Sequence, residues 1–199
     1  MSEKPKTYHH GNLSAALIAA GMKVLRQDGA EKLSLRAVAE HVGVSRTAPY
    51  AHFPDKRALL LSISAAGFEA LTAQMRGALD ADGPPREQVL ALGAAYVRFA
   101  LDNQNLYRLM LSTMTGASDG DAGETFGAAV KQAALQPHDL IREQFLRMAK
   151  DPDRTEVLSQ GAWGMVHGLA SLMGEGLVDV PDGGVEKILR TFMEALPKA

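Results

Sequence analysis

The stretch from Leu33 to Phe53 constrains the fold of this chain more than any other part of the sequence. Its first half carries apolar residues at offsets of three, four and seven, which is the spacing of one helix face. Ser34 precedes this face as a suitable N-cap, and Gly43 follows it where a left-handed residue commonly ends a helix. The sequence therefore predicts a short helix and a sharp turn. The residues on the predicted face are Leu35, Val38, Ala39 and Val42.

A second helix is expected directly after this turn, with Ser45 as its N-cap. Its first turn would contain Arg46, Thr47 and Ala48, and its second turn Tyr50, His52 and Phe53. Two helices around a tight turn form a helix-turn-helix, in which the first residues of the second helix contact base edges in DNA. The same pattern also occurs in proteins that use it only for packing.

The residues that follow the turn resemble a known family. The segments Val44 to Arg46 and Tyr50 to Leu60 (Tyr-Ala-His-Phe-Pro-Asp-Lys-Arg-Ala-Leu-Leu) are similar to the N-terminal domain of the tetracycline-repressor (TetR) family of bacterial transcription regulators. The resemblance extends over about residues 8–62. One residue departs from it, because Pro49 stands where many members have leucine. Proline lacks an N–H and restricts the residue before it, so we expect the second helix to be tighter or bent at Ala48.

Two further segments resemble one subgroup of this family. The lead-in from Tyr8 to Leu13 is similar to that of the subgroup, whose C-terminal domain also carries a Trp, His and Gly signature. Trp163, His167 and Gly168 match this signature. The resemblance implies an N-terminal domain that binds DNA and a C-terminal domain that binds a small molecule and dimerises.

The charge is distributed unevenly along the chain. The net charge is −2, but residues 1–60 hold nine Lys and Arg against five Asp and Glu, a net +4, and residues 61–199 hold twelve against eighteen, a net −6. Neutralisation of DNA phosphates is local, so a basic head on an acidic body fits DNA contact at one end. Chance asymmetry of solvated faces gives the same modest counts.

Composition excludes several classes of site. The chain has no cysteine, which removes disulfides, thiol catalysis and zinc fingers. No uninterrupted apolar run approaches the ~20 residues of a membrane span, and the first residues lack the apolar core of a signal peptide. We therefore expect a cytoplasmic protein without a membrane partner.

The sequence does not indicate an enzyme. The six histidines, at positions 9, 10, 41, 52, 138 and 167, show no catalytic or metal-binding spacing with carboxylates. There is also no Gly-rich phosphate loop and no nucleophile elbow. We expect no cofactor and no metal site. A metal-free helical hydrolase and a helical scaffold are the alternatives to a DNA-binding regulator.

Periodicity along the chain predicts an all-α fold with two domains. Residues 1–60 would form the helix-turn-helix domain with an N-terminal arm over residues 1–10, and residues 61–199 the effector-binding and dimerisation domain. The clearest turn-rich break lies at residues 80–85, and Pro137 should break or kink one long helix. The expected helices outside the helix-turn-helix span residues 13–27, from Asp55 to about 79, 86–102, 104–115, about 122–150, about 154–173 and from about 184 to 196.

Two helix N-termini are assigned caps. Asn12 would cap the first helix, which ends near Gly29, and Asp55 would cap the fourth. The start of the fourth helix exposes backbone N–H groups that favour anions, and Lys56 stands beside them. The expected buried residues of these helices are Leu13, Leu17, Ala20 and Val24, and Leu59, Leu60, Ile63, Phe68, Leu71 and Met75.

The last two helices carry a predicted dimer interface. Three glycines recur in the penultimate helix, and each costs ~1 kcal/mol relative to alanine in a helix interior, which indicates a compensating packing gain. These two helices would pair with their copies as a four-helix bundle, as the resemblance also implies; alternatively, the apolar stripe of the last helix covers the core of one chain. The predicted interface residues are Gly161, Gly164, Gly168, Leu172, Val185, Ile188, Leu189 and Phe192.

The resemblance implies an unknown small-molecule effector in the C-terminal domain. Trp163 and His167 lie four residues apart on one helix face, opposite the glycines, and could line a cavity wall. Apolar and aromatic residues at helical spacing are otherwise plain core. The candidate pocket residues are Phe99, Tyr107, Met110, Met114, Trp163 and His167.

The resulting hypothesis is a homodimeric repressor that binds a near-palindromic double-stranded DNA operator and is released by a small molecule. Repression, rather than activation, follows from the resemblance alone. Base edges would be contacted by Arg46, Thr47 and Ala48, with Arg46 suited to guanine. Phosphates would be contacted by Ser45, Tyr50, His52 and Lys56.

Overall fold

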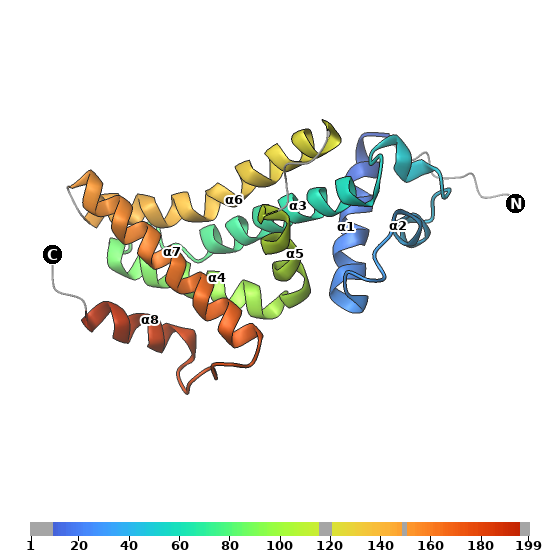
Figure 1. Cartoon of the computed structure of the whole chain (residues 1–199). Coiled ribbons are helices and arrows are strands. Elements are labelled where there is room, and N and C mark those ends of the chain that lie inside the picture. Colours follow the sequence, from blue (N-terminus) through green and yellow to red (C-terminus); the bar gives the residue numbers. More distant parts are fainter. Residues whose placement is uncertain (1–9, 116–120, 149–150, 196–199) are drawn as a thin grey trace, which may run out of the picture.

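The computed structural model describes residues 10–115, 121–148 and 151–195. Throughout these residues the chain is helical, with eight α-helices, one short 3₁₀ helix and no strand, so the predicted all-α fold is confirmed. Figure 1 shows an elongated molecule with a small head at its N-terminal end and a larger helical body. The head contains α1 (His10–Asp28), α2 (Leu35–Val42) and the 3₁₀ helix η1 (Ala48–Ala51). The predicted arm over residues 1–10 lies outside the described residues except for His10.

The head is built around the predicted helix-turn-helix. Helix α2 (Leu35–Val42) begins where expected, because the Ser34 Oγ accepts a hydrogen bond of 3.1 Å from the Ala37 N–H. It ends at Gly43, whose φ of 76° is left-handed and therefore favours glycine. Leu35, Val38 and Ala39 are buried, and Val42 is half-buried. Both the cap and the turn are confirmed.

Helix α1 (His10–Asp28) packs across α2 and begins earlier than expected. Because Asn12 lies inside this helix, its assignment as the N-cap is wrong. Helix α1 ends as predicted at Gly29, with φ 79° and an N–H that donates to the Leu25 carbonyl at 3.1 Å. Of its expected core residues, Leu17, Ala20 and Val24 are buried and Leu13 is half-buried.

Helix α3 (Lys56–Gly77) runs from the head into the body without interruption. The Asp55 carboxylate caps it, accepting from the Ala58 N–H at 2.8 Å. It packs on α1 in the head and on α4 (Pro85–Asp102), α5 (Gln104–Thr115) and α6 (Asp121–Met148) in the body. It is the one helix in the described ranges long and apolar enough to cross a membrane, and 61% of its most apolar window is buried inside the protein. Residue 60, the predicted domain boundary, lies inside this helix.

Helices α4, α5 and α6 pack on α3, and α7 (Pro152–Gly174) and α8 (Gly184–Ala195) complete the body from outside. Helix α6 lies along α3, α7 crosses α4 and α6, and α8 covers α4 at the end away from the head (Figure 1). The break predicted at residues 80–85 joins α3 to α4, which pack against each other.

Helix α6 continues through Pro137, so the predicted break at this residue is wrong, and the alternative of a kink stays a prediction. An internal proline costs ~3 kcal/mol because it removes one helical hydrogen bond and crowds the preceding turn. Burial on both sides of the proline offsets this cost, since Val130 lies in the core before it and Ile141 and Phe145 after it. Tertiary packing therefore outweighs the tendency of proline to end a helix.

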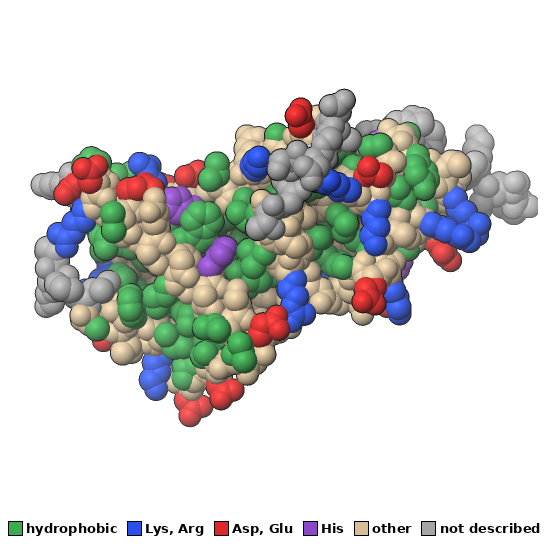
Figure 2. All heavy atoms as spheres, in the orientation of Figure 1, with side chains coloured by type: hydrophobic (Ala, Val, Ile, Leu, Met, Phe, Trp, Pro, Cys, Tyr) green, Lys and Arg blue, Asp and Glu red, His purple; other side chains and the backbone are tan. Residues whose placement is uncertain are grey.

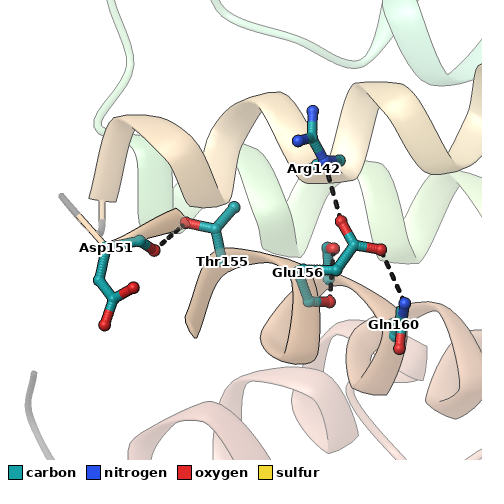
Figure 3. A network of polar contacts seen from close by, with 6 residues as sticks. Arg142, Asp151, Thr155, Glu156 and Gln160 are labelled. Atoms are coloured by element: carbon teal, nitrogen blue, oxygen red, sulfur yellow. Dashed lines mark hydrogen bonds and ion pairs between the residues drawn. The ribbon is translucent and has the colours of Figure 1, made fainter. Parts of the chain in front are cut away.

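A polar network holds the start of α7 against α6 (Figure 3). The Arg142 guanidinium donates from Nε to the Glu156 carboxylate at 3.1 Å, and the Gln160 amide donates to the other carboxylate oxygen at 2.7 Å. These hydrogen bonds, first from Gln160 and then from Arg142, lower the pKa of Glu156. The Asp151 carboxylate caps the helix, accepting from the Asp153 N–H at 3.0 Å. These surface contacts add to the packing of α7 on α6.

Candidate nucleic-acid interface and interior cluster

The segment after the Gly43 turn is tighter than an α-helix. Only η1 (Ala48–Ala51), a 3₁₀ helix, forms there, so the full second α-helix expected from Ser45 onward is wrong. The physical reason is Pro49, which is buried at the start of η1 and has no N–H to donate. Hydrogen bonds instead span three residues, as from the Tyr50 N–H to the Thr47 carbonyl at 3.1 Å. The tightening predicted at Ala48 is confirmed.

Ser45 does not cap this segment. Its Oγ lies 3.2 Å from the Thr47 Oγ1, with which it shares a hydrogen bond, and Thr47 precedes η1 without a side-chain cap. The N-cap role assigned to Ser45 is therefore wrong. Both hydroxyls lie on the surface of the turn, where they can still accept from or donate to a ligand.

The predicted DNA-contacting residues lie on the outside of the head. Ser45, Arg46, Thr47 and Lys56 are exposed, Tyr50 is 58% exposed, and Ala48 and His52 are half-buried. Phe53, in contrast, is 1% exposed and anchors the segment in the core. We call residues 45–50 the recognition segment. Its outer surface is polar and basic, and two buried residues, Pro49 and Phe53, attach it to the rest of the head.

Lys56, which the sequence predicts to be a phosphate contact, is the first residue of α3. Its Nζ donates to the Ala30 carbonyl at 3.4 Å, which positions the ammonium beside the loop that follows α1. An ammonium has three donors, so two stay available to an anion. The first N–H groups of α3 add positive potential at the same place.

A ring contact and a hydrogen bond are among the contacts that join the head to the body. The Phe53 ring packs on Phe126 of α6 with centroids 6.3 Å apart and an interplanar angle of 45°. The Asn105 side chain of α5 donates to the Leu25 carbonyl near the end of α1 at 3.2 Å. Movement of α5 or α6 would therefore act directly on the orientation of the head.

An aromatic cluster with polar tips lies inside the body. The Tyr96 hydroxyl shares hydrogen bonds with the His167 Nδ1 and, at 3.3 Å, with the Tyr107 hydroxyl. Burial raises the pKa of Tyr96 and Tyr107 and lowers that of His167, so all three groups are neutral near pH 7. The cluster ties α4, α5 and α7 together through uncharged hydrogen bonds.

Trp163 extends this cluster toward α6. Its indole stacks on the His138 imidazole with centroids 4.7 Å apart and an interplanar angle of 28°, and it meets His167 edge-on at 5.5 Å. The Trp163 Nε1 and the His138 Nε2 are buried without a hydrogen-bond partner. These atoms are the least satisfied polar groups in the described core.

The structure brings together only part of the candidate pocket set. Tyr107, Trp163 and His167 meet in the cluster, whereas Phe99 and Met110 are buried core residues and Met114 is 38% exposed. Sequence analysis missed Tyr96 and His138. Tyr96 precedes Phe99 by three residues on the same helix face, a signal that could have found it. His138 has no such local signal, because its partner comes from another helix.

The buried imidazole predicts a dependence of stability on pH. Since burial lowers the pKa of His167 below its ordinary value of 6.5, the unfolded chain binds a proton in a range where the folded chain does not. The contribution of His167 to stability is therefore fully present above pH 6.5 and is lost as the pH falls below it. We expect the urea midpoint to fall less between pH ~7.5 and ~5.5 in His167→Gln than in the unaltered protein. Equal decreases in the two proteins would contradict this expectation.

The predicted dimer residues divide into two groups. A Cβ added to Gly161, Gly164 or Gly168 would meet nothing within 4 Å, so the glycine side of α7 is open in the single chain. Phe192 is 51% and Leu172 43% exposed, and Ile188 is half-buried. Val185 and Leu189 are instead buried within the chain, against its own core.

Hydrophobic side chains gather around this open surface. Figure 2 shows them over α7, α8 and the connection between the two helices. Scattered apolar residues are normal on a protein surface, but a contiguous apolar surface commonly marks an interaction site. The most exposed large apolar residues of these elements are Val157, Leu172, Leu177, Val180 and Phe192.

Comparisons with known proteins agree with this architecture. A family model described as bacterial regulatory proteins, tetR family, matches residues 17–63, and one described as tetracyclin repressor-like, C-terminal domain, matches residues 89–196. The nucleoid occlusion factor SlmA of Vibrio vulnificus is 25% identical over 142 residues, which are 71% of this chain and 72% of that protein.

Solved structures resemble the whole chain. A protein of unknown function from Rhodococcus sp. RHA1 is 31% identical, with a TM-score of 0.77 over 95% of both chains. A TetR-like transcriptional regulator from Rhodococcus sp. RHA1 is 15% identical, with a TM-score of 0.64 over 92% of this chain and 94% of that one. The TetR family transcriptional regulator PfmR from Thermus thermophilus is 19% identical, with a TM-score of 0.58 over 89% of this chain and 91% of that one.

Proposed function

Because the chain belongs to the tetR family of bacterial regulatory proteins, we propose that it is a homodimeric repressor released from a near-palindromic operator by a small molecule. The family consists of transcriptional regulators, so the function is DNA binding rather than catalysis. The observation that carries the proposal is the recognition segment from Ser45 to Tyr50, which lies on the outer surface of the head. The Gly43 turn and the buried Phe53 hold it in this position. A repressor of this kind acts in the cytoplasm.

We assign the residues of this segment separate roles. Arg46, Thr47 and Ala48 would contact base edges, and a bidentate arginine contact to guanine is worth ~1–3 kcal/mol of discrimination. The phosphate contacts would come from Ser45, Tyr50, His52 and Lys56. Burial supports these roles, because the core takes up only Pro49 and Phe53 and leaves the assigned side chains exposed or half-buried.

Dimerisation would pair α7 and α8 with their copies. The open glycine surface of α7 and the exposed Phe192 of α8 support this arrangement. Two heads would then meet half-sites spaced by about one helical turn, ~34–36 Å, or a multiple of it. Light scattering that gives a monomer at micromolar concentration would overturn this part of the proposal.

Release by an effector requires a coupling of ~1–3 kcal/mol between body and head. A continuous set of contacts supports such coupling. His167 of α7 meets Tyr107 of α5 with ring centroids 6.1 Å apart, and Asn105 of the same helix holds the Leu25 carbonyl of the head. Displacement of α7 would thus reach α1 through a single intervening helix.

A nuclease footprint on the DNA that flanks the gene for this protein, at near-physiological salt, tests the proposed function. Protection of a near-palindromic stretch is the expected result. The proposed function would be overturned if neither this region nor a genomic selection gave a protected stretch, and if binding to every DNA were weak and salt-sensitive. Attraction to phosphates alone gives such binding.

Two substitutions test the division between base and phosphate contacts. We expect Arg46→Ala to relax specificity at one base position, because a base-edge contact is lost. We expect Lys56→Ala to weaken binding to all sequences alike and to reduce the slope of log affinity against log salt by about one. Binding titrations with operator and random DNA measure both effects. Equal losses on the two DNAs for Arg46→Ala would contradict the assignment.

A further inference from the structure

A second feature of the body is an apolar cavity of ≈ 250 Å³ between α4, α6, α7 and α8. It lies toward the end of the body that is distant from the head, where α8 covers α4. Every residue around it is apolar or a glycine. None of the six candidate pocket residues named from the sequence lines it. It is therefore separate from the aromatic cluster.

The cavity and the aromatic cluster lie on opposite sides of α7. Leu158, Ala162 and Val166 face the cavity, whereas Trp163 and His167 belong to the cluster. One helix therefore forms a wall of both. A molecule that displaces α7 from the cavity side would change the contacts of His167 on the other side.

The cavity has a buried interior and an exposed mouth. Its inner wall includes Ile141, Phe145 and Leu189, which are 1%, 4% and 5% exposed. Its mouth includes Val157 and Phe192, which are 69% and 51% exposed, together with the exposed Gly161. The mouth thus opens on the same surface of α7 and α8 that we propose as the dimer interface.

Two exposed ion pairs join α8 to α4 beside this cavity. The Arg190 guanidinium makes a bidentate contact with the Glu87 carboxylate of α4, at 2.9 and 2.8 Å. Arg98 of α4 lies 2.7 Å from the Glu186 carboxylate. Exposed ion pairs contribute little stability, and it is the buried residues of α8 that attach this helix to the core. The space beneath α8 is therefore a feature of the packed body.

We propose that this cavity binds a small uncharged apolar molecule, a substituted aromatic ring or a short alkyl chain, and that a second copy of the chain closes its mouth. This inference rests on the proposed function, since it names the chemical class of a ligand that would stabilise the proposed dimer. The bound molecule fills space that α4, α6, α7 and α8 leave open, and it is covered only in the dimer.

The lining determines the ligand class. No side chain around the cavity can pair with a charge or donate a hydrogen bond, so an ionised ligand would lose its hydration without compensation. An apolar cavity of ~150 Å³ is sufficient to hold benzene. The larger space here accommodates a ring with a substituent, and its affinity comes from removing apolar surface from water.

The position of the mouth couples binding of the ligand to dimerisation. A ligand that is shielded only when two chains meet binds the dimer more tightly than the monomer. By linkage, the same ligand must then strengthen the dimer by the same factor. The flat glycine side of α7 suits closure of the mouth, because it presents no side chain at Gly161 that would fill the cavity.

The test uses 4-fluorotoluene as the probe, followed by ¹⁹F NMR, with 4-fluorobenzoate as its charged counterpart. Leu158→Trp fills the cavity, and Leu169→Trp is the matched control, since both leucines are half-buried on α7 but only Leu158 lines the cavity. Sedimentation equilibrium with and without the probe reports the dimer dissociation constant. Circular dichroism and the DNA footprint are recorded for each protein.

We expect the full chain to bind 4-fluorotoluene and not 4-fluorobenzoate. Leu158→Trp should bind 4-fluorotoluene at least tenfold more weakly, whereas Leu169→Trp should keep the affinity of the unaltered protein. Saturating probe should lower the dimer dissociation constant at least fivefold. Binding that survives in Leu158→Trp, a preference for the benzoate, or a dissociation constant that the probe leaves unchanged would overturn the inference. An intact footprint alongside any of these outcomes would leave the proposed function standing.

Discussion

Replacement of Phe53 by alanine is expected to remove ~3–5 kcal/mol of stability, the usual cost of truncating a buried phenylalanine, and with it binding to the operator. Phe53 is 1% exposed and closely follows η1, so its ring attaches the recognition segment to the head. The same ring contacts Phe126 of α6 and therefore also joins the head to the body. A cavity at this position removes both connections.

Urea unfolding followed by circular dichroism measures the loss of stability, and a titration with operator DNA measures the loss of binding. Tyr50→Ala is the matched control, because Tyr50 is an aromatic residue of the same segment but is 58% exposed. We expect Tyr50→Ala to weaken DNA binding with a change in stability of less than about 0.5 kcal/mol, as is usual at the surface. A Phe53→Ala protein as stable as Tyr50→Ala would contradict the anchoring role.

The elements that sequence predicted well are those with local causes. The caps at Ser34 and Asp55 and the left-handed turn at Gly43 depend on side chains within three or four residues, and all three are confirmed. The bounds of α5 (Gln104–Thr115) also agree with periodicity alone. Local chemistry is readable from a single sequence because its partners are adjacent in the chain.

The elements that sequence predicted poorly depend on distant partners. Pro137 is a strong helix breaker, yet α6 continues because packing on α3, α4 and α7 outweighs the cost. The pairing of His138 with Trp163 and of Tyr96 with His167 joins separate helices, which no spacing reveals. Likewise, a stripe on α8 does not distinguish Leu189, which faces the core, from Phe192, which is exposed.

Substitution of Gly164 by glutamate is expected to give a folded monomer that binds operator DNA ~10²–10⁴-fold more weakly. A Cβ at Gly164 would meet nothing within 4 Å, so the glutamate is accommodated in the single chain. At a two-fold interface, however, each copy would bring a carboxylate to the same apolar surface, where its hydration is lost without a partner. With the dimer lost, each head binds its half-site alone and the gain from linking two sites disappears.

The strength of this test is that the substitution should improve the helix itself. Glycine is less favourable than glutamate inside a helix by ~0.5–1 kcal/mol, so the thermal stability of the monomer should not fall and misfolding would not explain lost DNA binding. Gly77→Glu is the matched control, since a Cβ at Gly77 would also meet nothing within 4 Å but lies in α3, away from α7 and α8. Sedimentation velocity and an operator titration provide the readouts. A dimeric Gly164→Glu protein with full affinity would place the dimer interface elsewhere, because a buried pair of like charges on this surface would prevent association.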